Sequence, residues 1–93
     1  MICGRYYLGM DHMEEIQPIR REVFGQELGF PENINFDDID ENAIHAVAYK
    51  DIDRTIPVAT GRLHKTGDGE DFKIGRIAVK KEERGQGYGD FIV

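Results

Sequence analysis

Short segments in which branched and aromatic residues alternate with polar ones predict four β-strands. The segments are residues 1–8, 43–51, 56–65 and 72–79. The polar connection "IDRT" between the second and third segments is short enough for a hairpin. The sequence "TGDGED" is typical of a turn and separates the third segment from the fourth. The last three strands therefore follow one another directly, which favours antiparallel pairing.

The spacing of apolar residues between the first two strands predicts a helix. Its apolar residues recur at helical intervals: Met13, Ile16, Val23 and Phe24. Asp11 followed by Glu14 has the spacing of a capping box, which would open the helix. Residues 31–42 are acidic and loop-like, with room for one short helical turn.

Proline and glycine predict where this helix bends and ends. Pro18 would remove a backbone hydrogen bond inside a helix, so the helix either kinks there or begins near Gln17. Gly25 and the sequence Gly29-Phe30-Pro31 are expected to end it. The resulting order is β-α-β-β-β, then a turn and the start of a second helix. This order predicts an α+β fold with a mostly antiparallel four-stranded sheet.

Composition narrows the classes of function. The chain has 93 residues, which suits one domain, and 40% of them are hydrophobic, as in globular proteins. A net charge of −6 argues against general binding of nucleic acid. No apolar run reaches the roughly 18 residues of a membrane-spanning helix. A single cysteine, Cys3, cannot form an internal disulfide. We therefore expect a soluble cytoplasmic protein that binds neither nucleic acid nor membrane.

The glycine-rich sequence Arg84-Gly85-Gln86-Gly87-Tyr88-Gly89 stands between the last strand and the second helix. Glycines there let successive backbone N–H groups turn toward one point, and a helix N-terminus adds partial positive charge. Together these features would hold an anion. The spacing matches neither the dinucleotide fingerprint nor the phosphate-binding loop of nucleotidases. A plain flexible turn is the alternative interpretation.

With its strand context, this motif resembles the GCN5-related N-acetyltransferase superfamily. That superfamily carries Q/R-x-x-G-x-G/A after its fourth strand, and Arg84, Gly87 and Gly89 fill the three defining positions. "RIAV" before it is similar to the end of the family's fourth strand, and "IRREVFGQE" and "DDID" resemble the N-terminal region of small bacterial members. The resemblance implies that residues 1–93 are a single truncated acetyltransferase-like domain, the N-terminal half of the acyl-CoA N-acyltransferase fold.

The resemblance also implies a ligand and a site. Acetyl-CoA would be the co-substrate and an unknown amine the acceptor. The residues expected to bind acetyl-CoA come from the strand end and the loop: Ile77, Ala78, Val79, Arg84, Gly85, Gln86, Gly87, Tyr88 and Gly89. Backbone amides near 77–79 would polarise the thioester carbonyl. The fourth strand has no carboxylate, so the base would be water, Glu27, an acidic loop residue or another chain, and no catalytic residue is assigned.

Several residues have a structural interpretation beside the functional one. Tyr88 is expected to pack on the sheet, although it could touch a ligand. Lys80 and Lys81 could meet the 3′-phosphate of CoA or lie in a solvated turn. The remaining candidates are interpreted as structural: His45 and His64 as strand residues, Asp37, Asp38, Asp40 and Glu41 as a solvated loop, Arg20 and Arg21 as surface residues, and Cys3 as a buried filler. No metal site is predicted.

Two features predict that the domain does not act as a lone monomer. The last seven residues, "GYGDFIV", are too few to cover a sheet face, and residues 72–79 form an edge strand open to another chain. A homodimer or a complementary C-terminal chain would restore the missing burial. Three functions remain open: an acetyltransferase completed in this way, a non-catalytic module that binds acyl-CoA or another anion, and a structural remnant.

Overall fold

The fold is described from a computed structural model that covers residues 3–31, 38–66 and 71–93. Its strands are β1 (Cys3–Leu8), β2 (Ile44–Tyr49), β3 (Pro57–Lys65) and β4 (Phe72–Val79). Its helical segments are α1 (Met13–Arg20), the π-helical η1 (Arg21–Glu27), the 3₁₀ turns η2 (Asp38–Asn42) and η3 (Lys81–Glu83), and α3 (Tyr88–Ile92). All four predicted strands are confirmed within a few residues. The parts of the predicted first strand, acidic loop and turn that fall on residues 1–2, 32–37 and 67–70 lie outside the described residues.

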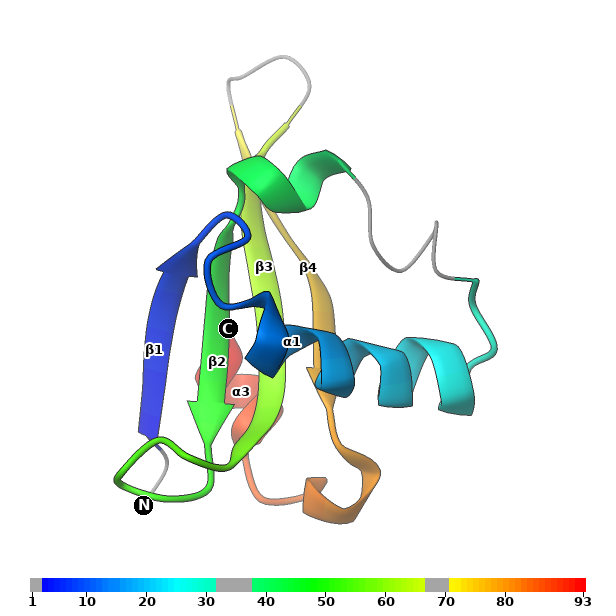
Figure 1. The fold of residues 1–93 in the computed structure, drawn as a ribbon, viewed down its shortest axis with the longest axis vertical. Helices are drawn as coiled ribbons and strands as arrows, with labels where there is room; N and C mark the ends of the chain where they lie inside the picture. Colours follow the sequence, from blue (N-terminus) through cyan, green and yellow to red (C-terminus); the bar gives the residue numbers. More distant parts are fainter. Residues whose placement is uncertain (1–2, 32–37, 67–70) are drawn as a thin grey trace.

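The described strands form one sheet with the order β1-β2-β3-β4, and every neighbouring pair is antiparallel (Figure 1). This arrangement confirms the predicted α+β class and makes β4 an edge strand. The register shifts between Thr60 and Arg62, where β4 carries an extra residue, and Arg76 has a φ of +50° there. A residue with that φ marks a bulge, which bends the end of β4 that leads into the glycine-rich loop.

Helices lie on both faces of the sheet, with α1 crossing in front and α3 behind in Figure 1. On the α1 face, Ile16, Val47 and Tyr49 are fully buried. On the other face, Tyr88 and Ile92 of α3 pack against the sheet. Their partners there are Ala48, Val58 and Ala59. The apolar stripe predicted for α1 therefore faces the core, and the short α3 already contributes to a second core.

The beginning of α1 differs from the prediction. His12 is the N-cap residue, and no side chain makes a capping hydrogen bond, so the capping box predicted from Asp11 and Glu14 is wrong. The helix accommodates Pro18 rather than starting near it, and the chain continues as the π-helix η1. Because proline cannot donate a backbone hydrogen bond, the regular ladder is interrupted before the wider π turn begins.

The end of the helical segment is partly as predicted. Gly25 lies inside η1 and does not end it. Gly29 has a left-handed φ of +76°, and its N–H donates to the Gly25 carbonyl at 2.9 Å. A left-handed residue after a helix reverses the chain at little cost only when it is glycine. Gly29 is therefore the residue that ends the segment.

Candidate functional site

The glycine-rich loop after β4 has the backbone that its sequence predicts. The chain makes one 3₁₀ turn, is extended at Arg84 and enters α3 at Tyr88. Between them, Gly85 has φ +85° and Gly87 has φ +88°. A Cβ at Gly85 would meet nothing within 4 Å, so glycine is required there by backbone conformation rather than by space.

The N–H groups of this loop are not used within the described part of the chain. Arg84 donates its N–H to the Lys81 carbonyl at 3.4 Å, and Phe91 donates to the Gly87 carbonyl at 3.0 Å. Between these two bonds, the amides from Gly85 to Gly89 make no hydrogen bond to another described residue. Five successive amides next to the start of a helix are thus available to an acceptor outside the loop.

The side chain of Arg84 contacts residues outside the glycine-rich loop. Its Nη1 and Nη2 donate to the two carboxylate oxygens of Glu27 at 2.6 and 2.9 Å. Its Nε donates to the Val79 carbonyl at 3.2 Å. The hydrogen bonds raise the pKa of Arg84 and lower the pKa of Glu27. The Arg84 guanidinium therefore forms an ion pair with the Glu27 carboxylate, which balances its positive charge.

The residue before Arg84 fixes the loop from the other side. Glu83 is buried, and one of its carboxylate oxygens lies 2.8 Å from the Lys50 amine just after β2. The other oxygen accepts a long hydrogen bond of 3.5 Å from the Gln86 side chain. The hydrogen bond to Glu83 raises the pKa of Lys50. Two adjacent residues of opposite charge therefore tie the loop to η1 and to β2.

The edge of β4 leads directly into the loop. Lys80 donates its N–H to the Val58 carbonyl of β3 at 3.0 Å. Because strand amides alternate in direction, the Val79 amide and carbonyl point to the other side, where the described residues place no further strand. The Val79 carbonyl on that edge is the one that Arg84 contacts. Ile77 is partly exposed, whereas Ala78 is buried beneath η1.

The other residues predicted for the site differ in what they can offer a ligand. The Tyr88 side chain is 5% exposed and packs in the core, so only its main chain can face a ligand. Gly89 lies in the first turn of α3. Gln86 and Lys81 are exposed, and Lys80 is partly buried. The loop can therefore present main-chain amides and two lysines, while the aromatic ring supports it from below.

A buried ionic cluster was missed by the sequence analysis. Arg20 contacts both carboxylate oxygens of Asp40, at 2.8 and 3.2 Å, and Arg62 donates to the same carboxylate at 3.0 Å. Arg20 and Asp40 are each 1% exposed, so the predicted surface arginine and solvated aspartate are both wrong. Burial lowers the pKa of Arg20, and Asp40 offsets this effect. The signal was present, because Arg20 falls on the helical stripe four residues after Ile16.

The two strand histidines have structural partners, as predicted. His45 is fully buried, and its Nε2 lies 3.0 Å from the Asp40 carbonyl. Burial lowers the pKa of His45, so the ring is neutral at pH 7. His64 Nδ1 lies 2.9 Å from the Lys65 carbonyl. In the described ranges, no group of three or more histidine, cysteine or acidic side chains is arranged to hold a metal ion.

A second polar network near the start of α1 was also not predicted. The Tyr49 hydroxyl donates a hydrogen bond to the Glu15 carboxylate. The Tyr7 hydroxyl lies 2.6 Å from the Tyr49 hydroxyl. The Tyr7 ring stacks on His12 with a centroid distance of 3.7 Å. Burial raises the pKa of the Tyr49 hydroxyl. Cys3 packs against the core cluster that contains Met13 and Val47, as predicted for a filler, but it is only partly buried.

The site and the fold agree with a known family. The family model for the acetyltransferase (GNAT) family matches residues 10–93. The chain belongs to the GNAT family. The matched residues include β2, β3, β4, the glycine-rich loop and α3. The whole candidate site therefore lies within the matched range. Within the described residues, no helix is long and apolar enough to cross a membrane.

Solved structures give the same fold. An N-acetyltransferase from Lactobacillus plantarum is 26% identical, with a TM-score of 0.73 over 97% of this chain and 62% of that one. Escherichia coli ElaA is 25% identical, with a TM-score of 0.80 over 99% of this chain and 64% of that one. An acyl-CoA N-acyltransferase from Pseudomonas aeruginosa shares the fold at 24% identity and a TM-score of 0.80, and 65% of it is covered. The chain thus spans slightly less than two thirds of the length of these solved structures.

Proposed function

We propose that this GNAT chain binds acetyl-CoA through the loop after β4 and takes part in transferring the acetyl group to an amine. The observation that carries the proposal is the run of amides from Gly85 to Gly89, which make no hydrogen bond to another described residue. A pyrophosphate would accept hydrogen bonds from these amides next to α3. The open edge of β4 at 77–79 would lie along the pantetheine arm.

The chemistry follows from what an acetyl transfer requires. The amine nitrogen attacks the thioester carbonyl, the C–S bond breaks, the amine loses a proton and the thiolate takes one up. We assign polarisation of the carbonyl oxygen to the Val79 amide, because it lies on the edge of β4 where no further described strand pairs. For this hydrogen bond the acetyl group must lie beside Val79, where Arg84 already occupies the neighbouring carbonyl.

We assign no base. Glu27 is held by Arg84, and its lowered pKa makes it a weaker base than an ordinary carboxylate. Asp40 is buried between two arginines. We propose that the active site is completed by a second copy or by a complementary chain, because Glu27 and Asp40 are both held by arginines. We also propose that the protein works in the cytoplasm, which the single cysteine supports.

A non-catalytic module that binds acyl-CoA is the second candidate. It is favoured by the absence of a carboxylate from the sequence of β4 and by the use of Glu27 as the partner of Arg84. Calorimetry with CoA and acetyl-CoA tests the binding that both candidates require. Release of free thiol from acetyl-CoA in the presence of a panel of amines then separates the enzyme from the module. Failure of CoA to bind at high micromolar concentration would leave the loop with a structural role only.

A further inference from the structure

Carboxylates surround the loop that we propose as an anion site. Glu82 and Glu83 come directly before it in η3, and Glu27 of η1 contacts its first residue, Arg84. The whole chain also has a net charge of −6. A negative charge near an anion site opposes binding unless a cation or water offsets it. The affinity of the loop for a phosphate group therefore depends on how each of these carboxylates is balanced.

The three carboxylates differ in what offsets their charge. Glu82 is exposed, so water and salt screen it. Glu27 accepts two hydrogen bonds from the Arg84 guanidinium. The Glu83 side chain is only 8% exposed, so water screens its charge little. Without a partner, the charge of Glu83 would therefore act on the loop more strongly than that of Glu82.

Lys50, which comes just after β2, is the partner of Glu83. Its amine lies 2.8 Å from one Glu83 oxygen, and the other oxygen accepts the long hydrogen bond from the Gln86 side chain inside the loop. The hydrogen bond to Glu83 raises the pKa of Lys50, so the amine keeps its positive charge at neutral pH. The buried carboxylate and this amine therefore form a neutral pair directly beside the glycine-rich loop.

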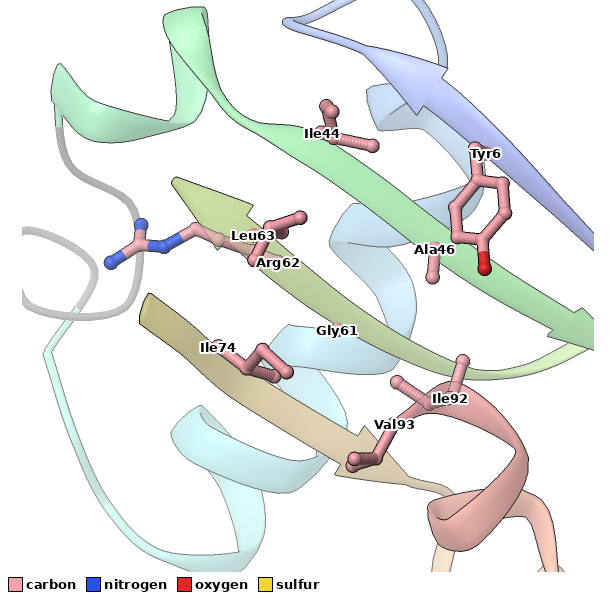
Figure 2. Close-up of a pocket in the computed structure, with 9 residues that line it drawn as sticks. All are labelled: Tyr6, Ile44, Ala46, Gly61, Arg62, Leu63, Ile74, Ile92 and Val93. Atoms are coloured by element: carbon pink, nitrogen blue, oxygen red, sulfur yellow. The ribbon is translucent and has the colours of Figure 1, made fainter. Parts of the chain in front are cut away.

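The loop itself is held by contacts that do not involve the Lys50 amine. Glu83 donates its N–H to the N-cap carbonyl of η3 at 2.9 Å. At the other end of the loop, the Tyr88 side chain is buried. Figure 2 shows Ile92 of α3 beside Gly61, and a Cβ at Gly61 would collide with Ile92. The position of the loop and the charge beside it can therefore be changed separately.

We propose that Lys50 supports anion binding by neutralising Glu83, without touching the ligand itself. The inference rests on the proposed function, because it needs an anion such as the pyrophosphate of CoA at the loop. Lys50 lies 33 residues before Glu83, outside the glycine-rich motif. Removing its amine leaves a poorly screened carboxylate next to the loop amides, and this charge repels a phosphate group.

Four chains test this balance of charge: the unmodified chain, Lys50→Met, Glu83→Gln and the variant with both changes. Calorimetry with CoA at low salt measures the affinity of each. We expect Lys50→Met to bind CoA roughly five- to tenfold more weakly. Glu83→Gln should bind at least as tightly as the unmodified chain, because the Lys50 charge is then unbalanced. The double variant should return to within about twofold of the unmodified chain.

Recovery in the double variant distinguishes a balance of charge from a structural contact. If the ion pair only held the loop in place, both single variants would weaken binding, and the double variant would bind no better than either. The loss in Lys50→Met should also become smaller in high salt. Lys73→Met is the matched control, because it removes an exposed lysine near the start of β4, and it should leave the affinity unchanged.

The outcomes separate this inference from the proposed function. An unmodified chain that does not bind CoA overturns both. An unmodified chain that binds CoA, with no recovery in the double variant, overturns the inference alone, and so does an unchanged affinity in Lys50→Met. If Lys50→Met fails to fold, Glu83→Gln decides the question. Equal or tighter binding of CoA by Glu83→Gln supports the inference, and weaker binding overturns it.

Discussion

Arg84 and Glu27 are 57 residues apart in sequence, and their side chains form a two-point contact at 2.6 and 2.9 Å. The same guanidinium reaches the Val79 carbonyl through Nε. Three of its donors are thus directed at protein acceptors, and they join η1, the edge of β4 and the loop. Arg84 therefore positions the loop, and we expect an anion at the loop to be bound by main-chain amides rather than by this side chain.

Replacing Arg84 with lysine separates the effect of its hydrogen-bonding geometry on CoA binding from the effect of its positive charge. Arg84→Lys keeps the positive charge but removes the planar fork and the Nε contact to Val79. We expect CoA to bind roughly three- to tenfold more weakly, which corresponds to the loss of one useful hydrogen bond. Calorimetry measures the affinity. Arg5→Lys on the exposed side of β1 is the matched control and should leave it unchanged. Equal affinity in Arg84→Lys would mean that Arg84 acts only as a charge.

Gly87 tests the backbone of the loop directly. Its φ of +88° is unfavourable for any residue with a Cβ, and branched residues are the least tolerant. Gly87→Val should abolish the binding of CoA while leaving the sheet intact, which calorimetry and circular dichroism show together. Gly25→Ala is the control, because a Cβ at Gly25 meets nothing within 4 Å and its φ is negative. If Gly87→Val unfolds the chain or dissolves its assembly, the loop is structural.

The sequence predicted the fold closely because local patterns determine most of it. The predicted and observed bounds of β4 agree, and the hairpin of β2 with β3 follows from alternation and a short turn. The departures arise from contacts between distant residues. Composition gives no sign that Asp40 pairs with Arg20 or that Glu27 meets Arg84, since each pair joins separate elements. The placement of the loop glycines was predictable from motif and strand context, whereas the direction of the Arg84 side chain was not.

Asp40 is predicted to be the most sensitive position outside the loop. Asp40→Asn removes a buried carboxylate from between two guanidinium groups, and breaking a buried ion pair costs about 3–5 kcal/mol. Urea unfolding should show this loss of stability, or the variant should fail to fold. Glu41→Gln, one residue later in η2 and exposed, should change stability by less than about 0.5 kcal/mol. A loss below about 1 kcal/mol in Asp40→Asn would show that the cluster stabilises the fold little.

His45 predicts how stability changes with pH. Burial lowers its pKa below the ordinary value of 6.5. Between the folded pKa and pH 6.5, the unfolded chain therefore binds a proton at His45 that the folded chain does not bind. The contribution of His45 to the free energy of unfolding is fully present above pH 6.5. It is lost as the pH falls from 6.5 toward the pKa of the folded chain. Burial is the largest effect on this pKa and opposes protonation, as do the charges of Arg20 and Arg62, whereas Asp40 favours it.

A neutral replacement isolates this contribution from other groups that titrate. His45→Gln can still donate to the Asp40 carbonyl, but it does not titrate. We expect urea midpoints of the unmodified chain to fall between pH 7.5 and 5.5, and those of His45→Gln to fall less. The difference between the two slopes is the measured quantity, because carboxylates contribute equally to both. Parallel slopes would show that the buried ring accepts its proton as readily in the folded chain as in the unfolded one.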